Sequence, residues 1–386
     1  MKKKENTYNR QRILSLFANI GVAEAYLEEI GHNVIVANEI DTKRAMLYQD
    51  IYPKTQMICG DITDMATFKK IIKTAKEGKV NCIIATPPCQ GMSTAGRQKK
   101  YDERNDLFKY ALNAVKESNP EYVLFENVTG FLKTHVMHNG KPILIPDVIK
   151  QEIGENYVIN FYSINAQDYD VPQNRERMIM LATRRGSFEW VMPEKSKKVI
   201  TMKDAIGWIP SIDPFVKDLP EDEFKKLFPQ YESRKKAALK ISKWNIPTSH
   251  VYRNVLTMQH TPTGCTAFDN LVYKPTKKDG TLVRGFHNTY KRQNWDTPAY
   301  TIAMDNIEIS SQNNVHPGRY LGKDKNGDDI YSDARTLTIF ELMRLMSIPD
   351  NWPIPENVNT SFLRHMIGEG VPPLLIKKIF ENIEYE

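Results

Sequence analysis

The sequence has 386 residues, of which 41% are hydrophobic, so the chain can bury a full core and is longer than a typical single domain. Its 53 Lys and Arg residues against 47 Asp and Glu give a formal net charge of +6, a mild excess that is compatible with a nucleic-acid backbone without requiring one. No apolar stretch reaches the roughly 20 residues of a membrane span, and the N-terminus has no signal-peptide core. We therefore expect a soluble, cytoplasmic protein.

Strands and helices alternate through the N-terminal half. Short apolar runs bounded by turn residues are typical of buried strands. The expected strands cover residues 12–17, 33–38, 57–62, 80–85, 122–128 and 178–182. Helical stretches are expected from the turn at residues 18–21 to about residue 29, and again over residues 106–118. Further along the chain, a charged helical stretch is expected over residues 221–240. This alternation predicts an α/β fold with a doubly wound, mostly parallel sheet.

Acidic residues follow the second and third expected strands. Glu39 and Asp41 stand where a nucleotide-binding sheet holds a ribose hydroxyl, although Asp41 is equally suited to cap the next helix. Asp61 could accept a hydrogen bond from an adenine amino group or cap the helix after it. The turn after the first strand carries one glycine, Gly21, and no G-x-G-x-x-G, so an ordinary dinucleotide is not the expected cofactor.

The run at residues 80–85 stops at Pro87, Pro88 and Cys89. The two prolines fix φ and lack an N–H, so they end sheet pairing and leave Cys89 on a stiff turn at the edge where α/β sheets bind ligands. A lone cysteine after a strand is more often a small buried residue. Here its surroundings favour a nucleophile.

Three further charged residues suit chemistry at the same edge. Glu126 ends the expected strand at residues 122–128, where a buried carboxyl can have a raised pKa and donate a proton; the alternative is a cap or an ion-pair partner. Arg175 and Arg177 lie two residues apart and face one side of an extended segment. Their guanidinium groups suit a carbonyl oxygen or a phosphate, whereas the simpler interpretation is an edge strand protected by charge.

The other cysteines and the histidines form no metal or disulfide pattern. Cys59, Cys82 and Cys265 are scattered without a C-x-x-C pair, which argues against both a disulfide framework and a zinc site. His135 and His138 form an isolated H-x-x-H, which we interpret as part of a loop. No metal is predicted.

Taken in order, Cys on a Pro-Pro turn, Glu-Asn-Val and Gln-x-Arg-x-Arg resemble the cytosine-5 DNA methyltransferases that use S-adenosylmethionine, particularly the prokaryotic restriction-modification type. Further segments resemble the family's cofactor turn (residues 17–21), ribose position (39 and 41), adenine-side segment (60–62), scaffold motif (335–350) and last motif (368–373), from which a helix packs back onto the cofactor domain. The resemblance implies a Rossmann-like catalytic domain with a second, smaller target recognition domain. We place the catalytic domain at residues 1–185, the recognition domain at 186–335 and a returning C-terminal segment at 336–386.

The resemblance also implies roles for individual residues. Cys89 would add to carbon-6 of a flipped cytosine, Glu126 would bind or protonate ring N3, and Arg177 with Arg175 would hold the carbonyl at position 2. The implied cofactor-binding residues are Phe17, Ala18, Asn19, Ile20, Gly21, Glu39, Ile40, Asp61, Ile62, Pro87, Glu369 and Val371. Candidate DNA contacts are Gln90, Ser93, Arg97, Gln173, Arg284, Lys291 and Arg292. The segments at residues 91–104, 257–261 and 284–292 are expected to be a closing loop and two base-reading segments.

Three positions depart from the family pattern. Asn19 replaces a usual glycine, Val22 replaces a usual glycine or alanine, and Glu369 replaces a usual asparagine. Asn tolerates a left-handed φ, whereas Val22 crowds the turn and would weaken cofactor binding.

The resulting prediction is a sequence-specific DNA cytosine-5 methyltransferase that acts as a monomer on double-stranded DNA beside a cognate endonuclease. An RNA cytosine-5 methyltransferase of related fold and a catalytically weak DNA-binding homologue remain alternatives. Amino-group methyltransferases are disfavoured. Their pattern at this loop is Asp or Asn, then two prolines and an aromatic residue, whereas this chain has Cys89 in the last of these positions.

Overall fold

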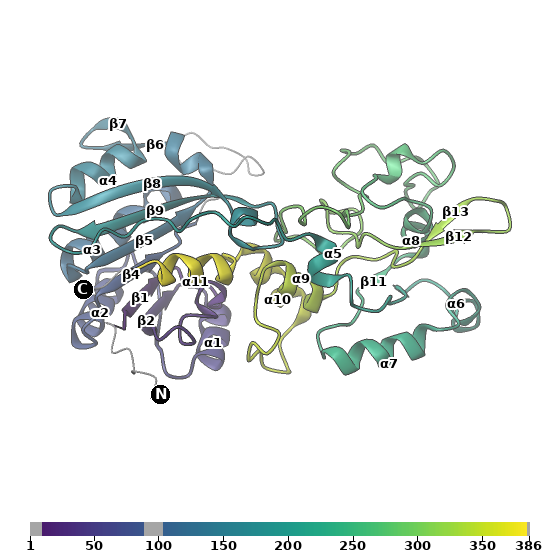
Figure 1. Cartoon of the computed structure of the whole chain (residues 1–386), viewed down its shortest axis with the longest axis horizontal. Coiled ribbons are helices and arrows are strands. Elements are labelled where there is room, and N and C mark those ends of the chain that lie inside the picture. The colour runs from purple at the N-terminus through teal and green to yellow at the C-terminus, as the bar shows by residue number, and fades with distance from the viewer. Residues whose placement is uncertain (1–9, 89–102, 384–386) are drawn as a thin grey trace.

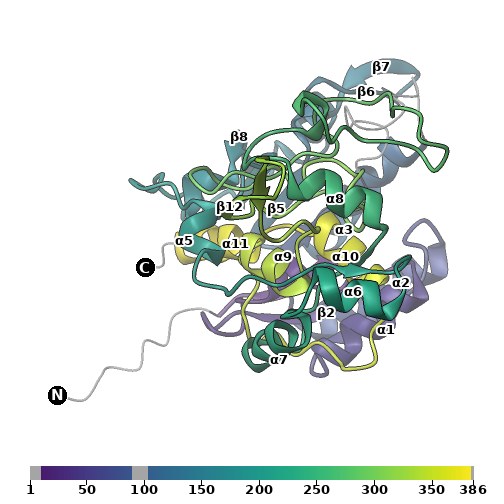
Figure 2. The ribbon, with the colours of Figure 1, turned by 90° about the vertical axis from the view of Figure 1, so that its right-hand side faces the viewer.

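The computed structural model describes residues 10–88 and 103–383. A lobe built on a large sheet lies beside a second lobe of short helices and long loops (Figure 1). Seen from the free end of the second lobe, helices α6, α7 and α8 lie in front of the sheet lobe (Figure 2). Within the described ranges, no helix combines the length and the apolarity needed to cross a membrane.

The central sheet has seven strands in the order β3-β2-β1-β4-β5-β9-β8. Their bounds are β1 Arg12–Leu16, β2 Asn33–Glu39, β3 Gln56–Cys59, β4 Cys82–Ala85, β5 Tyr122–Asn127, β8 Tyr157–Asn165 and β9 Glu176–Arg184. The first five pair in parallel, whereas β9 is antiparallel to both β5 and β8. The expected mostly parallel sheet is confirmed, and because β8 is the edge strand, β9 lies inside the sheet.

Helices cover both faces of this sheet. Strand side chains alternate between faces, so Leu14 and Ile83 pack with α2 (Met65–Glu77), α3 (Leu107–Ser118) and α4 (Ile145–Ile153). Their neighbours Ile13 and Ile84 pack on the other face with α11 (Pro373–Glu381). The helix expected to return from the last motif is therefore confirmed as α11.

Local capping explains where the first helices begin. Asp41 accepts a hydrogen bond from the amide of Arg44 and caps α1 (Thr42–Ile51), as one interpretation predicted. Asp64, not Asp61, caps α2, and Asp61 instead accepts from the amide of Thr63 at 2.8 Å. The capping interpretation of Asp61 is therefore wrong.

Three local expectations differ from the structure. The stretch after the first turn forms only a 3₁₀ helix, η1 (Val22–Glu24), and then turns, because its hydrogen bonds mostly span three residues. The charged helix expected over 221–240 is broken into α6 (Glu221–Leu227) and α7 (Tyr231–Ile241), with Pro229 between them. The H-x-x-H segment is not a loop but strand β6 (His135–His138), paired with β7 (Lys141–Leu144).

The second lobe has a core of its own. Its remaining elements are α5 Met202–Ile206, β10 Phe215–Val216, β11 Ser249–His250, α8 Tyr252–Gln259, β12 Tyr320–Lys323 and β13 Asp329–Tyr331. Val255, Met258 and Val315 are fully buried in this core. The helices α9 (Ile339–Leu345) and α10 (Thr360–Glu369) lie between the lobes (Figure 1). Short 3₁₀ helices occur at η2 Glu103–Asp106, η3 Thr129–Lys133, η4 Ala166–Tyr169 and η5 Ala267–Asp269.

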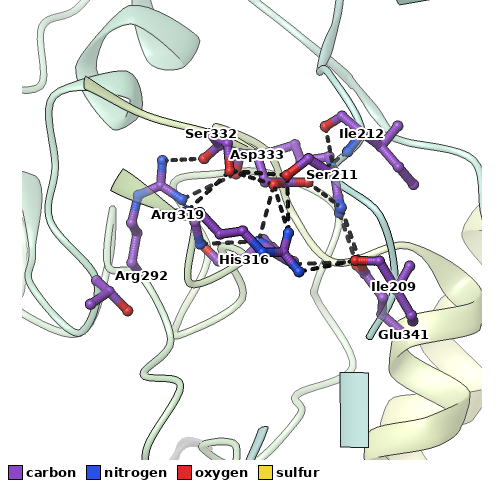
Figure 3. Close-up of polar contacts among 12 residues, drawn as sticks. Ile209, Ser211, Ile212, Arg292, His316, Arg319, Ser332, Asp333 and Glu341 are labelled. Carbon is purple, nitrogen blue, oxygen red and sulfur yellow. Dashed lines mark hydrogen bonds and ion pairs between the residues drawn. The ribbon is translucent and has the colours of Figure 1, made fainter. Parts of the chain in front are cut away.

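A buried charge network joins the second lobe to α9 (Figure 3). Arg335 donates to Asp333 at 2.8 Å and to both oxygens of Glu341 at 2.8 and 2.9 Å, and none of the three side chains is exposed. Asp333 also accepts from the amide of Ile212 at 2.9 Å. Burial alone would raise the pKa of Asp333, but the neighbouring His316 and Arg335 hold it well below its usual value. These bonds fix the segment that resembles the family's scaffold motif.

Candidate active site

A cleft of about 1850 Å³ opens at the carboxyl edge of the parallel strands. Its walls come from the ends of β1, β2, β4 and β5, from the start of β9, and from residues 301–304 and 368–371. Of the residues predicted from sequence, those that line it are Phe17, Ala18, Asn19, Glu39, Ile40, Asp61, Ile62, Pro87, Glu126, Arg175, Arg177, Glu369 and Val371. The structure thus brings segments from both ends of the chain to one site.

Some predicted site residues do not line this cleft. Ile20 is fully buried and packs in the core beneath the turn. Gly21 is also absent from the walls, but its backbone explains its place in the sequence, because φ is +78° and a Cβ would lie 2.2 Å from the Tyr52 ring. Cys89 lies outside the described residues, as do Gln90, Ser93 and Arg97.

The Pro-Pro turn is held at two points before the described chain stops. The Thr86 hydroxyl donates to the carbonyl of Phe17 at 3.0 Å. Asn127 Nδ2 donates to the carbonyl of Pro87 at 2.9 Å, and Asn127 is 2% exposed. Asn127 therefore ties the turn to the strand that carries Glu126. We did not single it out from the sequence, although it stands in the Glu-Asn-Val segment.

Glu126 and Arg177 form an ion pair in the cleft. Glu126 Oε1 lies 2.9 Å from Arg177 Nε, and the two side chains are 10% and 14% exposed. They meet because β5 and β9 are antiparallel neighbours. Burial raises the pKa of Glu126, and the charges of Arg177 and Arg175 only partly oppose this effect. A carboxyl in this environment can hold and deliver a proton at a ring nitrogen.

Arg175 has a different environment from Arg177. Its guanidinium donates to the carbonyls of Ile302 (3.1 Å), Gly368 (3.1 Å) and Gly370 (2.9 Å), and the residue is 2% exposed. Arg175 therefore ties the start of β9 to two distant segments of the cleft wall. The expectation that it contacts substrate together with Arg177 stays a prediction.

The first turn shares the cleft wall with a fixed carboxylate and two apolar side chains. Asn19 has φ of +51°, the left-handed conformation anticipated for this position. The carboxylate of Glu39 accepts from the amides of Asn19 (2.9 Å) and Asp41 (3.0 Å), which fixes it at the cleft wall. Ile40 is 63% exposed beside it, and Ile62 also lines the cleft. A fixed carboxylate suits ribose hydroxyls, and the apolar side chains suit an adenine face, so this donor set fits a nucleoside cofactor.

A buried carboxyl lies under the same turn. Glu24 is 3% exposed and accepts a hydrogen bond from Tyr48, while Tyr52 donates to the carbonyl of Gly21 at 2.6 Å. Trp352 Nε1 donates to the Tyr52 hydroxyl at 3.0 Å. Burial raises the pKa of Glu24 to about 7. Nothing in the sequence marked this residue, because its burial depends on residues from elsewhere in the chain.

The candidate DNA contacts fall into two groups. Arg284 is exposed, and Lys291 lies over the Tyr300 ring with its Nζ 4.6 Å from the ring centroid. Gln173 and Arg292, by contrast, are fully buried.

Both buried side chains are engaged with the protein's own backbone. Arg292 donates to the carbonyls of Met258, His316, Ser332 and Asp333. Gln173 Nε2 donates to the carbonyl of Leu345 at 3.2 Å. These two residues are structural in this fold rather than surface groups, which corrects the sequence interpretation.

The segment at residues 257–261 needs the same correction. It lies at the end of α8, and its side chains Thr257, Met258 and Thr261 are buried at 5%, 0% and 0% exposure. Three of its five side chains therefore belong to the lobe's core rather than to a base-reading surface.

Comparisons with known proteins identify this fold as that of a methyltransferase. The chain belongs to the C-5 cytosine-specific DNA methylase family, whose model matches residues 11–385. It is 41% identical to the Type II methyltransferase M1.HgaI of Avibacterium volantium, over 96% of this chain and 97% of that one. It is 28% identical to M.NgoPII of Neisseria gonorrhoeae, over 98% of this chain and 96% of the relative.

Solved structures show the same fold at lower identity. The methyltransferase EhMeth of Entamoeba histolytica superposes with a TM-score of 0.58 at 15% identity, covering 97% of this chain and 98% of that chain. The DNMT2 of Spodoptera frugiperda superposes with a TM-score of 0.55 at 15% identity, covering 97% and 99%. At these identities the likeness concerns the fold alone.

Proposed function

We propose that this chain methylates carbon-5 of a cytosine within a specific site of double-stranded DNA, using S-adenosylmethionine, as the modification enzyme of a restriction-modification system. One observation carries the proposal. The buried Glu126–Arg177 pair lies in the same cleft as Pro87, two residues before Cys89. The family match and the Type II names of the relatives support DNA as the substrate.

The residues have distinct tasks in this reaction. Carbon-5 of cytosine is a weak nucleophile, so the thiolate of Cys89 first adds to carbon-6 and makes the ring electron-rich at carbon-5. Glu126 holds a proton at ring N3, which stabilises the adduct. Arg177 orients Glu126 through their ion pair and would hold the ring carbonyl. Once carbon-5 carries the methyl group, a base takes its proton, the electron pair re-forms the C5–C6 double bond, and Cys89 leaves as the thiolate, which restores the aromatic ring.

The cofactor would occupy the part of the cleft beside the first turn. Glu39 would hold the ribose hydroxyls, and Ile40 with Ile62 would contact the adenine. When bound, S-adenosylmethionine supplies an electrophilic methyl group. Asn127 holds the carbonyl of Pro87, and the Thr86 hydroxyl bonds the carbonyl of Phe17, so the described part of the turn is tied to β5 and to the end of β1.

The DNA substrate must present its cytosine outside the helix. The reacting atoms of a stacked base are not accessible, so the target must be flipped into the cleft. Arg284, which is exposed on the second lobe, is the candidate phosphate contact that the described residues retain, and Lys291 is a weaker one. We further propose that the chain acts as a monomer in the cytoplasm beside a cognate endonuclease.

Methyl transfer from labelled S-adenosylmethionine to unmethylated DNA and to total RNA, assayed in parallel, tests the proposal. Sequencing then locates 5-methylcytosine in the labelled product. Label confined to one short DNA motif supports the proposal. Label confined to RNA overturns the choice of substrate. Intact cofactor binding with no label in either DNA or RNA points to the catalytically weak homologue.

Two substitutions test the assigned chemistry. We expect Cys89→Ser to retain the unfolding midpoint and cofactor affinity but to lose methyl transfer, because a serine hydroxyl is too weak a nucleophile at neutral pH. Glu126→Gln should lower kcat/KM by roughly 100- to 10,000-fold, the range of a general acid. Glu117→Gln, a 58% exposed carboxylate outside the cleft, is the control. Full activity of either test variant would contradict the mechanism.

A further inference from the structure

The three positions that depart from the family pattern meet in space. Asn19 lies in the first turn and Val22 begins η1 directly after it, whereas Glu369 is the last residue of α10. Asn19 Nδ2 donates to Glu369 Oε2 at 3.2 Å. A Cβ on Gly370 would lie 2.8 Å from the Val22 side chain, so the residue after Glu369 leaves space for the valine. The departures therefore build one contact between the two ends of the chain.

Glu369 also binds a third element. Its Oε2 lies 2.9 Å from Arg44 Nη1, in the first turn of α1, and its Oε1 lies 3.4 Å from His365 Nε2. The Glu369 and Arg44 side chains are 15% and 27% exposed. An ion pair at this depth is less screened by solvent than a surface pair, so it can hold its elements together. The carboxylate of Glu369 therefore connects α10 to the cleft wall and to α1.

Two carboxylates hold Asn19 in place. Its backbone amide donates to Glu39 Oε2 at 2.9 Å, and its side-chain amide donates to Glu369. A carboxylate only accepts hydrogen bonds, so the Nδ2 group must face Glu369. Glu39 is the residue assigned to the ribose. A movement of Glu369 would therefore shift Asn19 and, through it, the ribose-binding carboxylate.

The backbone around Glu369 has little freedom to move. A Cβ on Gly368 would lie 2.2 Å from the carbonyl oxygen of Ala303, and Arg175 donates to the carbonyls of both Gly368 and Gly370. The chain at Glu369 is held on both sides. Its side chain is thus held toward Asn19 and Arg44.

We propose that Asn19, Glu369 and Arg44 form a polar clamp that sets the position of the first turn and hence the affinity for the cofactor. The inference rests on the proposed function, because it takes the cleft to be the S-adenosylmethionine site. All three are positioning residues: they act through Glu39 and the turn, not on the reacting atoms. In this clamp Asn19 and Glu369 act as a pair. When one of them is replaced, the other no longer contributes to the affinity for the cofactor.

A double-mutant cycle tests the clamp. The variants are Asn19→Gly, Glu369→Asn and the double substitution, each restoring the usual family residue. S-adenosylhomocysteine affinity is measured by isothermal titration calorimetry. Each single change should weaken binding about fivefold, and the double change should also cost about fivefold rather than about 25-fold, a coupling within the range seen for contacting residues. KM for S-adenosylmethionine should rise while kcat stays within about twofold.

Glu29→Gln is the matched control. Glu29 pairs with Lys377 at 2.6 Å and also joins the N-terminal region to a C-terminal helix, but it lies outside the cleft walls. We expect the affinity of this variant for S-adenosylhomocysteine to stay within about twofold of that of the wild-type chain.

The outcomes separate the clamp from the proposed function. Single variants that bind normally, or a double variant that loses the product of the two single effects, would overturn the clamp while the methyltransferase assignment stands. An unchanged chain that binds no S-adenosylhomocysteine would overturn the proposed function and the clamp together.

Discussion

Glu24 should make the free energy of unfolding depend on pH through one buried group. Its pKa lies near 7 in the folded chain, against 4.5 in its ordinary state. The folded chain then binds the proton more tightly than the unfolded chain between these two values. By linkage, the contribution of Glu24 to the free energy of unfolding falls as pH rises from about 4.5 to about 7. Above that pH its contribution is constant. The difference of about 2.5 pKa units corresponds to ~3 kcal/mol at about 1.36 kcal/mol per unit.

Glu24→Gln removes this titration and keeps the shape of the side chain. Near pH 4 the variant and the unchanged chain should have similar stability, because the carboxyl is then largely neutral. Near pH 8 the variant should be more stable by ~3 kcal/mol, since it no longer carries a buried charge.

Urea unfolding followed by circular dichroism at a series of pH values measures this difference. Glu28→Gln is the control, because that carboxylate is 71% exposed and its replacement removes no buried charge. A difference between the Glu24 variant and the unchanged chain that is the same at every pH would refute the reasoning. So would a variant that is less stable at pH 8.

Two other substitutions address the first turn and the lobe junction. Gly21→Ala should lower the unfolding midpoint and weaken S-adenosylhomocysteine binding, because the new Cβ would lie 2.2 Å from Tyr52. Gly186→Ala is the control for backbone strain alone, because Gly186 has φ of +96° and its Cβ would meet nothing within 4 Å. It should lower the unfolding midpoint by less. Asp333→Asn should destabilise the chain by ~3–5 kcal/mol, measured by urea unfolding, because Arg335 loses a buried partner. A loss below about 1 kcal/mol would show that Glu341 alone compensates Arg335.

The sequence was most informative where structure depends on neighbouring residues. Buried strands, the end of β4 at the prolines and the cap at Asp41 all follow from local apolar runs and backbone chemistry. Helix extent was less well determined. The stretch after Gly21 and the break at Pro229 show that a helical composition does not set hydrogen-bond spacing by itself.

The order of the motifs along the chain also predicts most of the residues that line the cleft. Thirteen of the predicted catalytic and cofactor residues line one cavity, because the carboxyl ends of parallel strands share an edge. The sequence by itself therefore determined the fold class, the family resemblance and the edge that carries the chemistry.

Only the tertiary structure decided what individual polar side chains do. Arg175 and Arg177 are two residues apart, yet one bonds carbonyls more than 120 positions away and the other bonds Glu126. Arg292 resembled a DNA contact but is fully buried. The contact between Asn19 and Glu369 spans 350 positions. Burial and hydrogen-bond partners are set by segments brought together from afar, and no local pattern records which segments those are.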